Sequence, residues 1–136
     1  MDQVTVTIPD SARALLDTAA IGFLATIRPD GSPQTNPMWF AYDEASGTIR
    51  FTHTTKRGKY RNLQANPAMS FCLTEPGNGY RYAEFRGKLV EVIPDPEADF
   101  YQDLMERYGQ PRVKSADAAD RVILVMSVEA IDAARS

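Results

Sequence analysis

The sequence has few residues of the kinds that build metal centres, disulfides or nucleophilic catalytic sites. Its 136 residues include one cysteine, Cys72, and one histidine, His53. A single cysteine cannot form an internal disulfide, and one histidine with one cysteine gives no credible set of metal ligands. There is no G-x-S-x-G segment for a nucleophile, and no G-x-G-x-x-G segment for a Rossmann-type nicotinamide site. We therefore expect no metal site and no nucleophile–base pair.

Long apolar runs and a basic net charge are also missing. No apolar stretch reaches the roughly 18 residues of a membrane-spanning helix, and the N-terminus lacks the basic-then-apolar order of a signal peptide. The 15 basic and 18 acidic side chains give a net charge of −3, which argues against general nucleic-acid binding. We expect a cytoplasmic protein with no membrane or nucleic-acid partner. Its length and 43% hydrophobic content predict a single domain over 1–136.

The most distinctive stretch that is present holds four cations, Lys56, Arg57, Lys59 and Arg61, within six positions. Threonines, including Thr52, precede them, where a strand is expected to end and a helix to begin. Hydroxyls and cations donate to phosphate oxygens, and a helix N-terminus adds free N–H groups and a positive dipole end. The stretch predicts a site for a small anion such as a cofactor phosphate. The alternative is a solvated helix face, which is the usual role of a charge run.

Periodicity and turn residues predict a mainly β fold with short helices. Helices are expected over about 10–18, 56–65 and 97–108, and strands over 21–27, 34–42, 48–54, 68–73, 80–92 and 121–131. The first strand is nearly all apolar and is predicted to be buried on both faces. Pro37 cannot donate to a sheet ladder, so it predicts an edge, a bulge or a ligand-facing gap. Cys72 is expected to be a buried structural thiol, and Gly87 to mark a bulge or a tight bend.

Six strands joined mostly by hairpins favour a closed antiparallel barrel over a parallel α/β sheet. A barrel of this size has little room inside for a large cofactor. Such a ligand is therefore expected on the outside of the barrel or between two subunits.

Three segments in this order carry a family resemblance: 23–40 (FLATIRPDGSPQTNPMWF), 57–71 (RGKYRNLQANPAMSF) and 80–92 (YRYAEFRGKLVEV). With them the sequence resembles the split-barrel flavin- and deazaflavin-binding superfamily that includes pyridoxamine 5'-phosphate oxidase. Within it, the sequence is more similar to the F420-dependent oxidoreductases of actinobacteria, the branch that includes F420-dependent biliverdin reductases. The resemblance implies a six-stranded antiparallel split β-barrel and a homodimer with its cofactor at the subunit interface.

The resemblance also implies roles for single residues in cofactor binding. Thr52, Arg57 and Lys59 would hold the phosphate, and Lys59 is expected at the surface. Pro37, Met38 and Trp39 would lie beside the tricyclic ring. The remaining cofactor-binding candidates are Lys56 and Arg61, which could be spare cations or could contact an acidic tail. F420 has an oligoglutamate tail and FMN has none, so the extra cations favour F420.

Several aromatic and histidine side chains have two interpretations that the sequence leaves open. Tyr80 and Tyr82 would approach the cofactor of the other subunit and are the candidates for assisting the substrate, or they are dimer contacts without chemistry. Trp39 either walls the ring or is a core or interface aromatic. His53 is a satisfied structural histidine or a proton donor. The segment 112–120 matches no motif, and its role is open.

The resemblance implies an F420-dependent reductase that transfers a hydride from the reduced deazaflavin to a conjugated small molecule. A biliverdin-like tetrapyrrole, a quinone and an unsaturated lactone are all compatible substrates. A flavin or deazaflavin carries the hydride chemistry itself, which fits the scarcity of catalytic side chains. One alternative is an FMN-dependent flavoprotein, an oxidase or reductase of the same fold. The other is a cofactor-binding protein without turnover.

Overall fold

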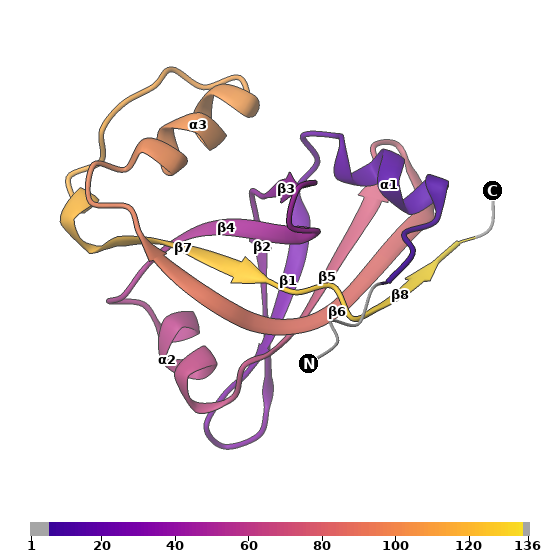
Figure 1. Cartoon of the computed structure of the whole chain (residues 1–136), viewed down its shortest axis with the longest axis horizontal. Helices are drawn as coiled ribbons and strands as arrows, with labels where there is room; N and C mark the ends of the chain where they lie inside the picture. Colours follow the sequence, from indigo (N-terminus) through magenta and orange to yellow (C-terminus); the bar gives the residue numbers. More distant parts are fainter. Residues whose placement is uncertain (1–5, 135–136) are drawn as a thin grey trace.

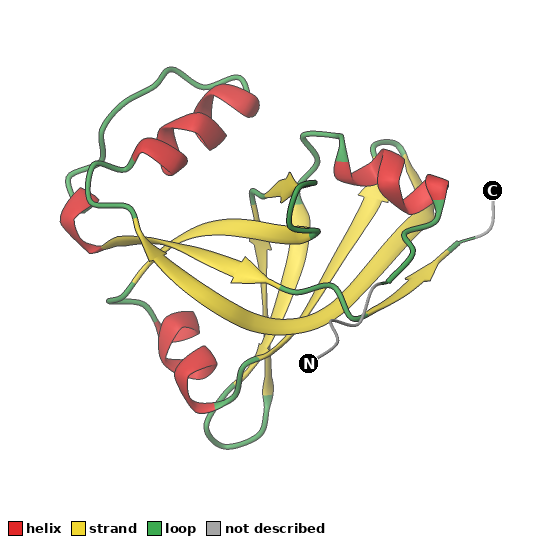
Figure 2. Cartoon of the chain, in the orientation of Figure 1, coloured by secondary structure: helices red, strands yellow, loops and turns green. Residues whose placement is uncertain are grey.

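The structure, a computed structural model, describes residues 6–134 and shows a curled antiparallel sheet with helices on its outside (Figure 1). Figure 2 shows how strands dominate the chain. The elements are α1 (Asp10–Leu16), β1 (Gly22–Ile27), β2 (Pro33–Met38), β3 (Ala41–Asp43), β4 (Thr48–Thr54), α2 (Gly58–Ala65), β5 (Ala68–Glu75), β6 (Asn78–Pro94), α3 (Asp99–Arg107), a 3₁₀ turn (Ala118–Asp120), β7 (Arg121–Met126) and β8 (Ala130–Ala133). The predicted mainly β, antiparallel fold is confirmed.

The strand order is β2-β1-β5-β6-β7-β4-β3, and β8 pairs with β6 outside this path. The long strand β6 belongs to both halves of the sheet, because its first part pairs with β5 and its last part with β7. The two end strands, β2 and β3, follow each other directly in sequence. The sheet is therefore closed by a chain connection rather than by a ladder between its ends, which is the arrangement of a split barrel.

The described chain has eight strands rather than the six expected because two predicted strands divide. The predicted strand 34–42 breaks at Trp39 and Phe40 into β2 and β3. There the Phe40 N–H donates to the Tyr108 hydroxyl at 3.1 Å, so the break is stabilised by a residue of another element. The predicted strand 121–131 divides into β7 and β8, which pair with different parts of β6.

Gly87 lies where β6 passes from one half of the sheet to the other. A Cβ atom at this position would lie 1.9 Å from the carbonyl oxygen of Ser127, so only glycine allows this close approach. The register shift itself lies between Leu89 and Glu91. The predicted bulge therefore lies close to Gly87, between Leu89 and Glu91. Gly87 itself allows the close contact with the Ser127 backbone.

The core is built around four fully buried phenylalanines, Phe40, Phe51, Phe71 and Phe85. The Phe71 ring meets Phe40 and Phe51 edge to face, with centroids 5.2 and 4.9 Å apart. Buried aromatic side chains of this size contribute about 1.5–3 kcal/mol each to folding. This core fills the barrel, so a large ligand can only bind outside it.

Only one face of β1 is buried in the described chain, contrary to the expectation of two. Leu24 faces the core, whereas Phe23 on the other face is 50% exposed and the neighbouring Ile21 is 45% exposed. Phe23 pairs with Cys72 of β5, whose thiol is half-buried on the same outward face rather than buried in the core. Pro37 lies on β2, the edge strand, which confirms the edge interpretation. The barrel therefore carries an apolar outward face.

No helix among residues 6–134 has both the length and the apolar character needed to cross a membrane.

Candidate cofactor-binding site

The basic cluster, Lys56–Arg61, lies where β4 ends and α2 begins. The predicted junction is confirmed, with α2 starting two residues later than expected, at Gly58. Arg57 has extended backbone angles at the N-cap, and no side chain caps the helix. The first turn of α2 also contains no acidic residue. Its first N–H groups and the positive end of its dipole are therefore available to an anion.

Asn62 fixes the orientation of α2 on the barrel. Its side-chain amide is buried and donates to the Thr26 hydroxyl at 3.1 Å and to the Gln34 side-chain oxygen at 3.0 Å. These two acceptors lie on β1 and β2, so the amide ties the helix to that hairpin. Lys59 precedes Asn62 by three residues and therefore shares its inward face. The docking of α2 thus explains why one cation of the cluster turns inward.

Lys59 is only 8% exposed, so the expectation of a surface side chain is wrong. Among residues 6–134, no carboxylate lies within salt-bridge distance of its ammonium group. Burial lowers the pKa of Lys59, and the charge of Arg57 lowers it further. A buried charge without a partner is unfavourable. An anion bound beside Lys59 would supply the missing counter-charge.

His53 adds a second unpartnered group in the same neighbourhood. It is 3% exposed, and its Nε2 atom has no hydrogen-bond partner within the described part of the chain. Burial lowers its pKa to about 4, with further contributions from the charges of Lys59, Arg57 and Arg121. The imidazole is therefore neutral at pH 7. The unpartnered Nε2 atom does not fit the interpretation of His53 as a satisfied structural histidine.

Lys56, Arg57 and Arg61 are exposed, and none has an acidic partner in the region 6–134. Most other cations of the described chain are paired with a carboxylate: Arg13, Arg50, Arg81, Arg86, Arg112, Lys114 and Arg121. A solvated helix face would normally mix both signs of charge. The cluster therefore has a local excess of positive charge that the fold leaves uncompensated.

Thr52 lies on the face of β4 opposite His53, beside an arginine that sequence reasoning missed. Arg121 begins β7 and pairs in register with Thr54 of β4. Its Nη1 donates to the Thr52 hydroxyl at 3.4 Å, and its Nε donates to Asp117 Oδ1 at 3.1 Å. The open segment 112–120 thus supplies a carboxylate that holds this arginine. The signal in the sequence was only a charged residue at the start of the last strand.

Trp39 belongs to an aromatic group with two tyrosines of the α3 region. Its ring stacks on Tyr108 with centroids 4.9 Å apart and is tilted against Tyr101 at 6.4 Å. The Tyr108 hydroxyl donates to the Ala20 carbonyl at 2.8 Å, which fixes the end of α3 to the start of β1. Burial raises the pKa of Tyr108. Tyr108 covers one face of Trp39, so this tryptophan is at least in part a packing residue.

The structure connects the predicted phosphate and ring ends of the site through α3. Trp39 follows Pro37 and Met38 of β2, and contacts Tyr101. The Tyr101 ring lies under the Arg121 guanidinium at 4.1 Å, and Arg121 reaches Thr52. A row of side chains therefore runs from the β2–β3 junction to Thr52 of β4.

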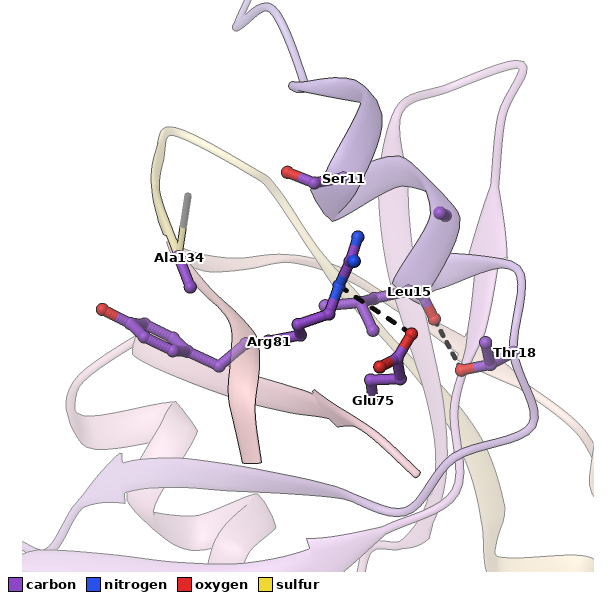
Figure 3. A pocket seen from close by; sticks show the side chains of 8 residues that line it. Ser11, Leu15, Thr18, Glu75, Arg81 and Ala134 are labelled. Carbon is purple, nitrogen blue, oxygen red and sulfur yellow. Dashed lines mark hydrogen bonds and ion pairs between the residues drawn. The ribbon is translucent and has the colours of Figure 1, made fainter. Parts of the chain in front are cut away.

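Tyr80 and Tyr82 are not brought to the basic cluster of their own chain. They lie on the β5–β6 hairpin beside α1, at the opposite end of the barrel from α2 (Figure 1). Tyr80 is 91% exposed and Tyr82 is 41% exposed. Tyr82 instead borders a pocket of about 130 Å³ between α1 and the hairpin, where Arg81 faces Glu75 at 3.8 Å (Figure 3). This pocket is separate from the cation cluster.

With this geometry in place, comparison with known proteins identifies the family. Residues 8–134 match the pyridoxamine 5'-phosphate oxidase family. The chain belongs to this family. It is 48% identical to a solved structure named F420 Reductase, with a TM-score of 0.87 over 92% of this chain and 98% of that one. The family and this likeness confirm the predicted resemblance, and they support an enzyme of the oxidoreductase type with a flavin or deazaflavin cofactor.

Two further solved structures share the fold at lower identity. A conserved hypothetical protein from Mycobacterium tuberculosis is 25% identical, with a TM-score of 0.73 over 98% of this chain and 88% of that one. General Stress Protein 26 from Bacillus anthracis is 16% identical, with a TM-score of 0.70 and 92% of both chains covered. The second similarity concerns the fold alone.

Proposed function

We propose that the protein is an F420-dependent reductase that transfers a hydride from the reduced deazaflavin to a conjugated organic molecule. The observation that carries this proposal is the buried ammonium of Lys59 among three exposed cations, none of which has a carboxylate partner within residues 6–134. A phosphorylated and acidic cofactor fits this donor set. The 48% identity to a protein named F420 Reductase supports F420 over FMN.

The chain would hold the cofactor through groups at two junctions of the barrel. Thr52, Arg57 and Lys59 would bind the phosphate, where charge-assisted hydrogen bonds contribute about 1.5–3 kcal/mol each. The remaining proposed contacts are Lys56 and Arg61 to the acidic tail, and the backbone of Pro37, Met38 and Trp39 beside the ring. The deazaflavin supplies the hydride when it is bound. The protein binds it, orients it and excludes water.

We further propose a homodimer with the site at the subunit interface. The outward face of β1 exposes Phe23 and Ile21, and the β5–β6 hairpin presents a nearly fully exposed Tyr80. Tyrosine is common at interfaces because it combines an apolar body with a polar tip. The hairpin lies far from α2 in its own chain, so Tyr80 and Tyr82 can serve the site only of a second copy. Sedimentation analysis of the purified chain tests this, and a monomer at working concentration would overturn it.

Turnover with chemically reduced F420 tests the proposed reaction. The purified protein is mixed with the reduced cofactor and one acceptor at a time: biliverdin, a quinone or an unsaturated lactone. The return of oxidised F420 absorbance is followed in each reaction. Acceptor-dependent oxidation that requires the protein supports the reductase. Turnover with reduced FMN alone would favour the FMN alternative. Cofactor binding without oxidation by any acceptor would favour a binding protein without turnover.

Tyr82→Phe tests whether the tyrosine hydroxyl assists the substrate. We expect a lower turnover rate with unchanged cofactor affinity, because only the hydroxyl is removed. Equal rates for the variant and the wild type would leave Tyr82 as a packing residue. The same substitution at Tyr42, which lies on β3 and outside the candidate site, is a matched control for the loss of a phenol elsewhere on the chain.

A further inference from the structure

We propose that Arg121 is a positioning residue that aims the Thr52 hydroxyl at the phosphate of the bound cofactor. This inference rests on the proposed function, since it assumes a phosphorylated cofactor at the β4–α2 junction. Sequence reasoning assigned no role to Arg121. The structure gives it three contacts, and one of them is to a residue of the candidate site.

The guanidinium of Arg121 is held on three sides. Its Nε donates to Asp117 Oδ1 at 3.1 Å, and its planar group lies 4.1 Å from the centre of the Tyr101 ring. Its Nη1 donates to the Thr52 hydroxyl at 3.4 Å. The side chain is 10% exposed. A guanidinium fixed in this way presents its donor in one direction, which a mobile surface arginine would not do.

The contact determines what the Thr52 hydroxyl can bind. Arginine has hydrogen-bond donors and no acceptor, so Thr52 must accept from Arg121. The single hydroxyl proton of Thr52 then remains free to be donated to another group. A phosphate oxygen accepts such a proton, whereas another donor would not. Pairing with Arg121 therefore makes Thr52 a donor for an anion.

The charge of Arg121 is balanced locally, which separates its role from that of the cation cluster. Asp117 neutralises it at close range. Lys59 and its exposed neighbours have no such partner in the part of the chain that the structure describes. The cluster thus supplies the attraction for an anion, and Arg121 supplies direction to one neutral donor.

The test compares each cofactor with a form that lacks its phosphate, and the FMN–riboflavin pair differs by the phosphate alone. Four proteins are titrated: the wild type, Arg121→Met, Thr52→Val and the double variant. Each is titrated with F420 and with its ring-and-ribityl fragment, which lacks the phosphate and the tail. FMN and riboflavin form a second pair of ligands. We expect Arg121→Met to weaken F420 binding about tenfold and to leave the fragment unaffected. In the Thr52→Val background the same change should have little further effect. Arg112→Met is the matched control, because it removes an exposed, paired arginine of the same region.

Equal losses for F420 and its fragment, or additive losses in the double variant, would overturn the inference. A wild type that binds neither F420 nor FMN would overturn the proposed function as well, so the two failures are distinguishable. If Arg121→Met does not fold, Thr52→Val and Thr52→Ser test the inference instead. Serine keeps the hydroxyl, so Thr52→Ser should bind F420 more tightly than the phosphate-free fragment, as the wild type does. An unchanged affinity in Thr52→Val contradicts the inference.

The single tryptophan separates positioning from a merely structural role. Trp39 contacts Tyr101, which lies under Arg121, so its emission reports on whether that aromatic group is intact. Loss of phosphate-dependent affinity with unchanged Trp39 emission supports positioning. Changed emission with equal weakening of all ligands would show that Arg121 only supports α3.

Discussion

Two regions of the molecule differ in whether their cations form ion pairs. At the β4–α2 junction, four neighbouring cations have no carboxylate partner among the described residues, and one of them is buried. Around α3, by contrast, Arg112 pairs with Asp103 and Glu106, Lys114 with Glu97, and Arg121 with Asp117. Of these, Arg112 ties the segment after α3 to two carboxylates of that helix. No ion pair among the described residues uses the cations of the cluster, and this contrast supports the ligand-binding role proposed for them.

Lys59→Met is expected to have the largest effect on cofactor binding. We expect F420 affinity to fall about tenfold or more, because a charge-assisted contact is lost. The free energy of unfolding should stay the same or rise, since a buried, unpaired ammonium is replaced by an apolar side chain of similar length. Fluorescence titration and urea unfolding measure the two effects. A less stable protein with wild-type affinity would assign Lys59 to the fold and not to the site.

His53 makes the unpaired region sensitive to acid. Its pKa is about 4 in the folded chain against an ordinary value of 6.5, so the unfolded state binds more protons between these values. Stability is therefore complete above about pH 6.5 and declines as the pH falls towards 4, by on the order of 3 kcal/mol. His53→Gln should flatten this part of the profile. Urea unfolding at several pH values checks it, and an unchanged slope in the variant would contradict the assignment.

Arg61→Ala tests which part of the cofactor the exposed cations of the cluster bind. We expect a loss of a few-fold in F420 affinity, because an exposed ion pair contributes only about 0.2–1 kcal/mol. FMN affinity should not change, since FMN lacks the acidic tail. The loss should also shrink at high salt, where exposed charges are screened. An equal loss of affinity for F420 and for FMN would show that Arg61 does not bind the acidic tail.

Lys114→Met is expected to have the smallest effect. It is the control taken from the region around α3, where the cations are paired. It removes an exposed pair with Glu97 and should change stability by about 0.2–1 kcal/mol or less. Cofactor affinity should equal that of the wild type. A loss as large as that of Lys59→Met would show that net charge, and not the unpaired cluster, governs binding.

Sequence reasoning located the strand-to-helix junction because its signals are local. Alternation over Thr48–Thr54 and the cations that follow were enough to place β4 and α2. It did not find the break after β2, which depends on the Tyr108 hydroxyl 68 positions away. The burial of Lys59 also escaped it, because that depends on how Asn62 docks α2 on β1 and β2.

Residues of the site that meet across the sheet were the hardest to predict. Arg121 reaches Thr52 from 69 positions away, through the pairing of β4 with β7. Nothing in the order of residues around Arg121 indicates that pairing. Similarly, the aromatic contact between Trp39 and Tyr108 joins a strand end to a distant helix. The sequence therefore located the segment for which we propose anion binding, but not the side chains that meet Thr52 across the sheet.

The most direct test of the central claim is a titration of purified apo-protein with F420 and, in parallel, with FMN, followed by ring fluorescence. We expect tight binding of F420, weaker binding of FMN, and an F420 affinity lower by about tenfold or more in Lys59→Met. Tight binding of FMN and weak binding of F420 would contradict the assignment of the outer cations to an acidic tail. Binding of neither cofactor would contradict the central claim that the unpaired cluster is a cofactor site.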